Sequence, residues 1–166
     1  PTATPPGVTP TPKPTATPAL SAARDLTGTW KGSGVYYYVD KATGQRLKTV
    51  TVDVTLAVVQ RDNTVTADMW KRVVKQEPPG EVSVKDPGTG YTRYSVSPVT
   101  DEKGPLQGTV SATTLILKTN TTGYTDLWEF TFTTDLMSGG FHTQMFWAPP
   151  FEVKSDPKAF SLVRQK

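Results

Sequence analysis

Apolar and polar residues alternate one by one along residues 49–60, TVTVDVTLAVVQ. The intervening Thr51, Asp53 and Thr55 are polar, which is the pattern of a β-strand with one buried and one solvated face. The other face carries five aliphatic side chains: Val50, Val52, Val54, Leu56 and Val58. No segment of the chain keeps an apolar period of about 3.6 residues over three turns, so the alternation predicts an all-β fold.

The same alternation recurs between turn sequences along the chain. QRDNT at residues 60–64 predicts a tight turn, after which Val65, Ala67, Met69 and Val73 share one face of a second strand. Further strands are expected at residues 91–96, 106–111, 114–118, 126–133, 140–147 and 159–164. A meander of about eight strands avoids exposed edges by closing on itself, so we expect a single up-and-down antiparallel β-barrel. An open sandwich is the alternative.

Residues 1–24 differ in composition from the rest of the chain. The first eighteen residues contain seven prolines and six threonines. Such a segment buries too little apolar surface to offset its ordering entropy, so we expect a disordered linker at residues 1–24 and one barrel domain at residues 25–166. The segment is similar to the Pro/Thr-rich stalks of bacterial lipoproteins and to the linkers of secreted proteins. Both interpretations place the domain outside the cytoplasm, at the cell surface or secreted, with or without a lipid anchor.

Composition excludes several classes of function. The chain has no cysteine, which excludes disulfides, thiolate catalysis and cysteine-based metal sites. Its net charge of +3 includes Lys13 and Arg24 of the linker, which leaves 16 basic against 15 acidic residues in the barrel domain. We therefore expect no nucleic-acid partner. No apolar run approaches the ~18 residues that span a bilayer, so membrane contact is expected only through an upstream anchor. We expect a monomer.

The first strand carries an unusual inward face. This strand lies in the sequence DLTGTWKGSGVYYY, residues 25–38. Its inward face holds an indole toward one end, tyrosines at the other end and glycines between them. The residues of this face are Leu26, Gly28, Trp30, Gly32, Gly34, Tyr36 and Tyr38. Glycines inside a strand mark a bend or a close approach of backbones, which a strongly coiled strand in a small barrel requires.

The sequence Gly28-Thr29-Trp30 resembles the Gly-x-Trp with which calycin barrels begin, meaning lipocalins, fatty-acid-binding proteins and avidins. Lipocalins also carry a Thr-Asp pair before a late strand, as at Thr125-Asp126, and an arginine near the end of the barrel, as at Arg164. The resemblance implies that Gly28, Trp30 and Arg164 close one end of the barrel, with the guanidinium stacked on the indole.

The ligand residues of the individual calycin families do not carry over. Lys166 stands where fatty-acid-binding proteins have a carboxylate-gripping tyrosine, and Lys31, Gly32 and Ser33 stand where avidins hold biotin. Haem barrels of the nitrobindin type use a histidine near the last strand, whereas His142 lies one strand earlier. We therefore expect no cofactor.

No arrangement of residues predicts catalysis or a metal site. His142 is the only histidine, it shares a strand face with Gln144 and Phe146, and the chain has no Gly-x-Ser-x-Gly elbow. Asp126 and Glu129 fall on opposite faces of their strand, so they do not form a carboxylate pair. With no second histidine and no cysteine, a tight transition-metal site is not expected. The sequence predicts a protein without enzymatic activity.

Aromatic residues offer two alternative binding surfaces. Trp128, Phe130 and Phe132 with Asp126, and Phe141, Met145 and Trp147 on the following strand, are predicted to line either an apolar cavity or a filled core. If a cavity is present, a small apolar or amphipathic ligand is expected at its mouth. The residues predicted to bind it are Tyr36, Tyr38, Trp128 and Phe141.

The second surface lies on the outside of the barrel. Tyr37, Trp70 and Tyr94 are predicted to face outward and to form a platform on which sugar rings stack. The protein would then be a carbohydrate-binding module with a polysaccharide partner, or a domain that interacts within the cell envelope.

Overall fold

The computed structural model describes residues 24–119 and 121–166 of the chain. The predicted linker at residues 1–24 therefore lies outside the described residues, apart from Arg24. The described residues include no helix that is long and apolar enough to cross a membrane. Their strands are β1 (Gly28–Asp40), β2 (Arg46–Arg61), β3 (Thr64–Glu77), β4 (Val82–Lys85), β5 (Thr92–Val96), β6 (Glu102–Val110), β7 (Thr114–Lys118), β8 (Tyr124–Phe132), β9 (Leu136–Met145), β10 (Phe151–Lys154) and β11 (Phe160–Arg164).

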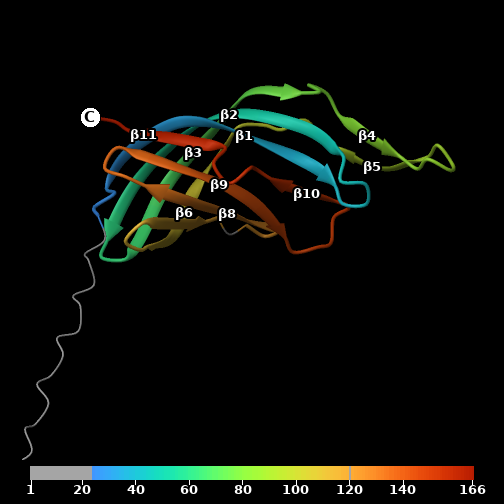
Figure 1. Ribbon diagram of the computed structural model, residues 1–166. Coiled ribbons are helices and arrows are strands. Elements are labelled where there is room, and N and C mark those ends of the chain that lie inside the picture. The colour runs from blue at the N-terminus through green and yellow to red at the C-terminus, as the bar shows by residue number, and fades with distance from the viewer. Residues whose placement is uncertain (1–23, 120) are drawn as a thin grey trace, which may run out of the picture.

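The strands close into one antiparallel barrel with eight positions around its circumference (Figure 1). Seven positions are β1, β2, β3, β6, β7, β8 and β9, each hydrogen-bonded to its neighbours. The eighth is shared end to end by β11, which pairs with residues 30–34 of β1, and β10, which pairs with residues 37–40. Because β1 also pairs with β2, the sheet has no free edge at this point. The predicted barrel is confirmed, and an open sandwich is excluded.

Several details of the strand prediction are wrong. Residues 91–96 do not belong to the barrel, because β5 pairs only with β4 in a separate hairpin that extends beyond the barrel (Figure 1). Strand β9 ends at Met145, so Trp147 does not line the interior and is 56% exposed. The chain leaves the ladder there because Pro149 and Pro150 follow, and proline has no N–H with which to continue the pairing. It returns as β10, which the sequence analysis did not identify.

One end of the barrel is capped by the first-strand tryptophan. Trp30 is fully buried, and its indole N–H donates a hydrogen bond of 2.9 Å to the Leu26 carbonyl. Arg164 is the cross-strand partner of Trp30, and its guanidinium carbon lies 5.5 Å from the centroid of the indole ring. The same guanidinium donates to the Thr27 carbonyl, which ties the start of β1 to β11. The last strand therefore covers the indole in the manner that the resemblance to calycins implies.

The middle of the barrel is filled by side chains. Apolar residues from every barrel strand form one buried cluster, and the most completely buried include Val50, Val52, Leu56, Leu115, Leu117, Phe130, Phe160 and Leu162. The burial of these apolar side chains is the main source of stability of the folded barrel. The sequence left two alternatives for the interior, a filled core or an apolar cavity. In the middle of the barrel the structure has a filled core.

Close contact between β1 and β11 depends on two glycines. A Cβ atom at Gly32 would lie 1.8 Å from the Ser161 carbonyl oxygen, and one at Gly34 would lie 2.2 Å from the Phe160 ring. Neither space can accept a methyl group, so the prediction that these glycines allow a close approach is confirmed.

We predict that Gly34→Ala lowers the free energy of unfolding by about 3 kcal/mol or more, because the methyl group overlaps the Phe160 ring. Gly104→Ala is the matched control, since a Cβ atom at Gly104 meets nothing within 4 Å. Urea unfolding of both variants measures the difference. Equal stability of the two variants would contradict the packing described here.

Candidate ligand-binding site

A cavity of about 190 Å³ opens at the end of the barrel opposite Trp30. Its walls combine three kinds of side chain. The aromatic ones are Tyr36, Tyr38, Tyr124 and Phe141, the polar ones are Lys71, Glu102, Asp126 and Thr143, and the aliphatic ones are Val99, Met145 and Val153. A concave site with an apolar body and a few polar groups is typical of small-molecule binding.

Three of the four predicted ligand residues line this cavity. Tyr36 and Phe141 meet edge to face with their ring centroids 4.9 Å apart, and Tyr38 lies two residues further along β1, toward the opening. Trp128 does not reach the cavity. It is fully buried and stacks against the inner side of Phe141 at 4.6 Å, so it supports the floor instead of touching a ligand.

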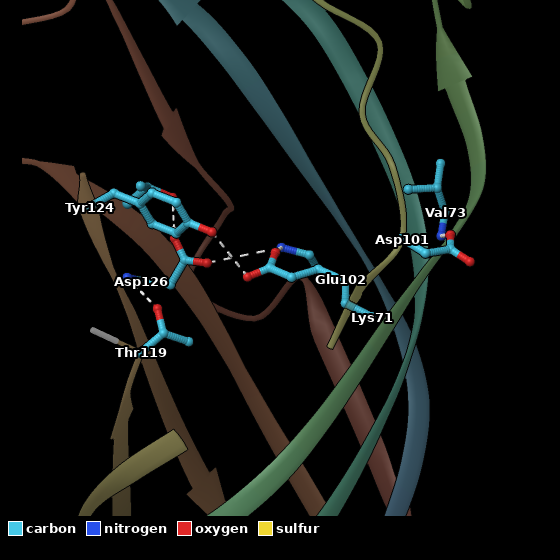
Figure 2. Close-up of polar contacts among 8 residues, drawn as sticks. Lys71, Val73, Asp101, Glu102, Thr119, Tyr124 and Asp126 are labelled. Carbon is cyan, nitrogen blue, oxygen red and sulfur yellow. Dashed lines mark hydrogen bonds and ion pairs between the residues drawn. The ribbon is translucent and has the colours of Figure 1, made fainter. Parts of the chain in front are cut away.

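The sequence analysis missed an ion pair in the cavity wall. Lys71 and Glu102 are direct cross-strand partners at the end of the β3–β6 pairing, and Lys71 Nζ lies 2.6 Å from Glu102 Oε2 (Figure 2). Lys71 is 4% exposed. Its Nζ atom lies 5.5 Å from the ring centroid of Tyr36 and 5.4 Å from that of Phe141. The sequence did contain a signal that Lys71 faces the interior, because it falls on the same alternating face as Val65 and the other apolar residues of β3.

A second cross-strand pair completes the polar wall. Asp126 is the partner of Thr143, whose hydroxyl donates to Asp126 Oδ1. The backbone N–H of Asp126 donates to Thr119 Oγ1 at 3.1 Å, and Asp126 Oδ2 lies 3.9 Å from Lys71 Nζ (Figure 2). Burial raises the pKa of Asp126, although Lys71 and Thr143 act in the opposite direction.

Three phenol groups stand around these charges. Tyr124 donates a hydrogen bond of 3.3 Å to Glu102 Oε1. Burial raises the pKa of Tyr38 and of Tyr124 to about 12, and it raises the pKa of Tyr36 as well. All three therefore stay protonated at neutral pH. Among the described residues, the hydroxyls of Tyr36 and Tyr38 have no hydrogen-bond partner, so both can bind a ligand.

The segment between β5 and β6 is fixed across one side of the opening. The Val99 N–H donates to the Gln76 side-chain oxygen at 2.9 Å, and the Gln76 amide donates to the Val99 carbonyl at 3.1 Å. Asp101 accepts a hydrogen bond of 2.8 Å from the Val73 N–H, just beyond the last β3–β6 pair (Figure 2). These bonds hold Val99 in the cavity wall.

The predicted outer platform does not form one flat surface. Trp70 is 44% exposed, but the Lys103 ammonium lies 4.6 Å from its ring centroid. The expectation of an exposed Tyr37 is wrong: the ring is 8% exposed, because the Arg46 guanidinium lies over it at 3.9 Å. Tyr94 lies in the β4–β5 hairpin, and its hydroxyl donates to Asp40.

The histidine and the carboxylates of the described residues are not gathered at one point of the site. His142 is exposed on β9 instead of facing the cavity. Within the part of the chain that the structure describes, no group of three or more His, Asp or Glu side chains is placed to hold a metal ion. Comparisons of the chain with protein-family models, with curated proteins and with solved structures each give no match.

We predict that Asp126 makes stability fall as the pH rises. Its pKa in the folded protein lies above the ordinary value of 3.8, so the folded state holds this proton more tightly than the unfolded chain does. The stabilising contribution is therefore full below pH 3.8 and is lost as the pH rises through the folded-state pKa. The amide of Asp126→Asn has no such proton, so this variant gains stability relative to the native protein as the pH rises from 3.8 through the folded-state pKa of Asp126.

Urea unfolding at several pH values measures this difference. Asp68→Asn on the exposed outer face of β3 is the control, because its carboxylate is solvated in both states. A difference between Asp126→Asn and the native protein that stays constant with pH would contradict the prediction.

Proposed function

We propose that the protein is a non-catalytic binding protein that holds a small amphipathic molecule in the mouth of its barrel. The observation that carries the proposal is the cavity itself, in which rings and buried polar groups converge on one space of about 190 Å³. Ligand pockets are usually about 300 Å³ or larger, and a water molecule takes about 30 Å³. The cavity therefore suits a small molecule, or the head group of a longer one.

Family and location form part of the same proposal. The closed barrel, Gly28-Thr29-Trp30 and the contact between Arg164 and Trp30 support a calycin-like protein. The Pro/Thr-rich composition of residues 1–24 supports an extracytoplasmic domain, tethered as in a lipoprotein or a secreted modular protein. Neither depends on the identity of the ligand.

The mouth is a better candidate than the outer aromatic residues. A sugar-binding platform needs rings with an open face, whereas Tyr37 is covered by Arg46 and Trp70 is approached by Lys103. Polysaccharide binding through Trp70 alone is the competing function.

We predict that Val99→Trp blocks ligand binding, because the larger side chain fills the opening. The probe is 2-phenylethanol, a small neutral amphipath, for which we expect a dissociation constant of about 1 mM. Amide chemical shifts of Tyr38 and Phe141, followed by NMR during titration, report binding at the mouth. They should move in the native protein and stay still in Val99→Trp.

Two control variants separate the alternatives. Val163→Trp adds the same indole on the outer face of β11, where Val163 is 49% exposed, and should bind like the native protein. Trp70→Ala should also bind normally. If the shifts of Tyr38 and Phe141 never move, or if Val99→Trp binds as well as the native protein does, the mouth is not the binding site. Slower migration in polysaccharide gels that Trp70→Ala abolishes would favour the platform instead.

A further inference from the structure

We propose that the ligand of the mouth site carries a protonated amine that pairs with the Asp126 carboxylate. This inference rests on the proposed function and specifies the chemical class of the ligand. Its basis is the unequal pairing of the three charged groups in the cavity wall.

The first argument is the balance of charge. One ammonium, that of Lys71, faces two carboxylates, those of Glu102 and Asp126. The ammonium lies 2.6 Å from Glu102 but 3.9 Å from Asp126, so Glu102 takes the hydrogen bond. Asp126 is 2% exposed, and no hydrogen bond among the described residues reaches its Oδ2 atom. Because Asp126 lines the cavity and its Oδ2 atom has no hydrogen-bond donor, an incoming ammonium would supply that donor.

The second argument is that, among the residues the structure describes, Lys71 is the one cationic side chain within ion-pair distance of Asp126. Lys48 on β2 is also buried, but its ammonium donates to the Gly80 carbonyl at 2.6 Å and does not line the cavity. His142 is on the same strand as Thr143, but it is exposed and also does not line the cavity. The cavity wall therefore has an excess of one negative charge when both carboxylates are ionised.

The third argument concerns the rings. Lys71 shows that Tyr36 and Phe141 accommodate an ammonium near their faces, at 5.5 Å and 5.4 Å from the centroids. The hydroxyls of Tyr36 and Tyr38 remain available as hydrogen-bond acceptors for a second N–H donor. An anionic head group would instead approach a wall with net negative charge and compete with Glu102 for Lys71.

The fourth argument predicts what the amine is attached to. The aromatic contacts continue outward from Tyr38 to Phe151, whose ring centroids are 5.6 Å apart. They continue from Phe151 to Trp147, whose ring centroids are 6.4 Å apart. Trp147 and the neighbouring Phe146 are both more than half exposed. This row of rings suits an apolar or aromatic tail that leaves the cavity, so the ligand class is an arylalkyl or alkyl amine.

Three probes of similar shape and different charge test the proposal on the full chain. They are 2-phenylethylammonium, 2-phenylethanol and 3-phenylpropanoate, each titrated by NMR at pH 7 with the Tyr38 and Phe141 amides as reporters. We expect the ammonium to bind about tenfold or more tightly than the alcohol, and the carboxylate to bind most weakly.

Two variants should change this preference in opposite directions. Asp126→Asn keeps the shape and an acceptor for Thr143 but removes the charge, so the ammonium should bind no better than the alcohol. Lys71→Met removes the competing ammonium and leaves two carboxylates, so the preference for the ammonium should increase. Asp68→Asn is the control and should behave like the native protein. A loss of packing alone would weaken all three probes together.

The outcomes separate the two proposals. If the alcohol binds at the mouth as tightly as the ammonium in the native protein, the amine inference is wrong and the binding site stands. If none of the three probes moves the reporter amides, the proposed function is wrong. Should a variant fail to fold, the ranking of the three probes on the native protein still decides the matter.

Discussion

Closure of the sheet around β1 is the constraint on which the rest of the structure depends. This strand pairs with β2 along one edge and with β11 and then β10 along the other. The second pairing brings β11 so near that a side chain at Gly32 would overlap the β11 backbone and one at Gly34 would overlap the Phe160 ring. Because the barrel closes there, the strands of its wall satisfy their backbone hydrogen bonds without an exposed edge.

Closure also determines where a ligand can enter. An eight-stranded barrel has an interior just wide enough for side chains to fill, and here the interior is filled from Trp30 to Trp128. Space remains at the other end, where Lys71 and Asp126 occupy inward positions. The stacked pair of Trp128 and Phe141 separates the two regions, since it belongs to the core on one side and forms the floor of the cavity on the other.

The sequence predicted the architecture well, because period-two alternation is a local signal that persists along each strand. It predicted Tyr36, Tyr38 and Phe141 at the cavity for the same reason. Depth along the barrel axis is not a local property, so Trp128 was placed one layer too near the opening. The cover over Tyr37 comes from Arg46 of β2, a pairing that depends on register and was not predicted.

The missed ion pair shows a different limit of sequence reasoning. Lys71 forms a short basic cluster with Arg72 and Lys75, and a charged cluster on a strand is usually solvated. Its position on the alternating face of β3 indicated the interior, but its partner Glu102 is thirty-one positions away and lies outside the strand predicted at residues 106–111. The charged neighbours of Lys71 favoured a position on the surface, whereas the alternation along β3 favoured the interior. The alternation was correct.

The buried charges at the mouth are not explained by the stability of the barrel. Replacing a buried ion pair with apolar residues of similar size is often neutral or stabilising, because desolvation offsets the attraction between the charges. Two strand positions before Lys71, Met69 occupies the same inward face and packs in the apolar core. An apolar side chain at position 71 would continue that apolar face without burying a charge. The charged groups instead keep the mouth polar, which supports the proposal of an amphipathic ligand.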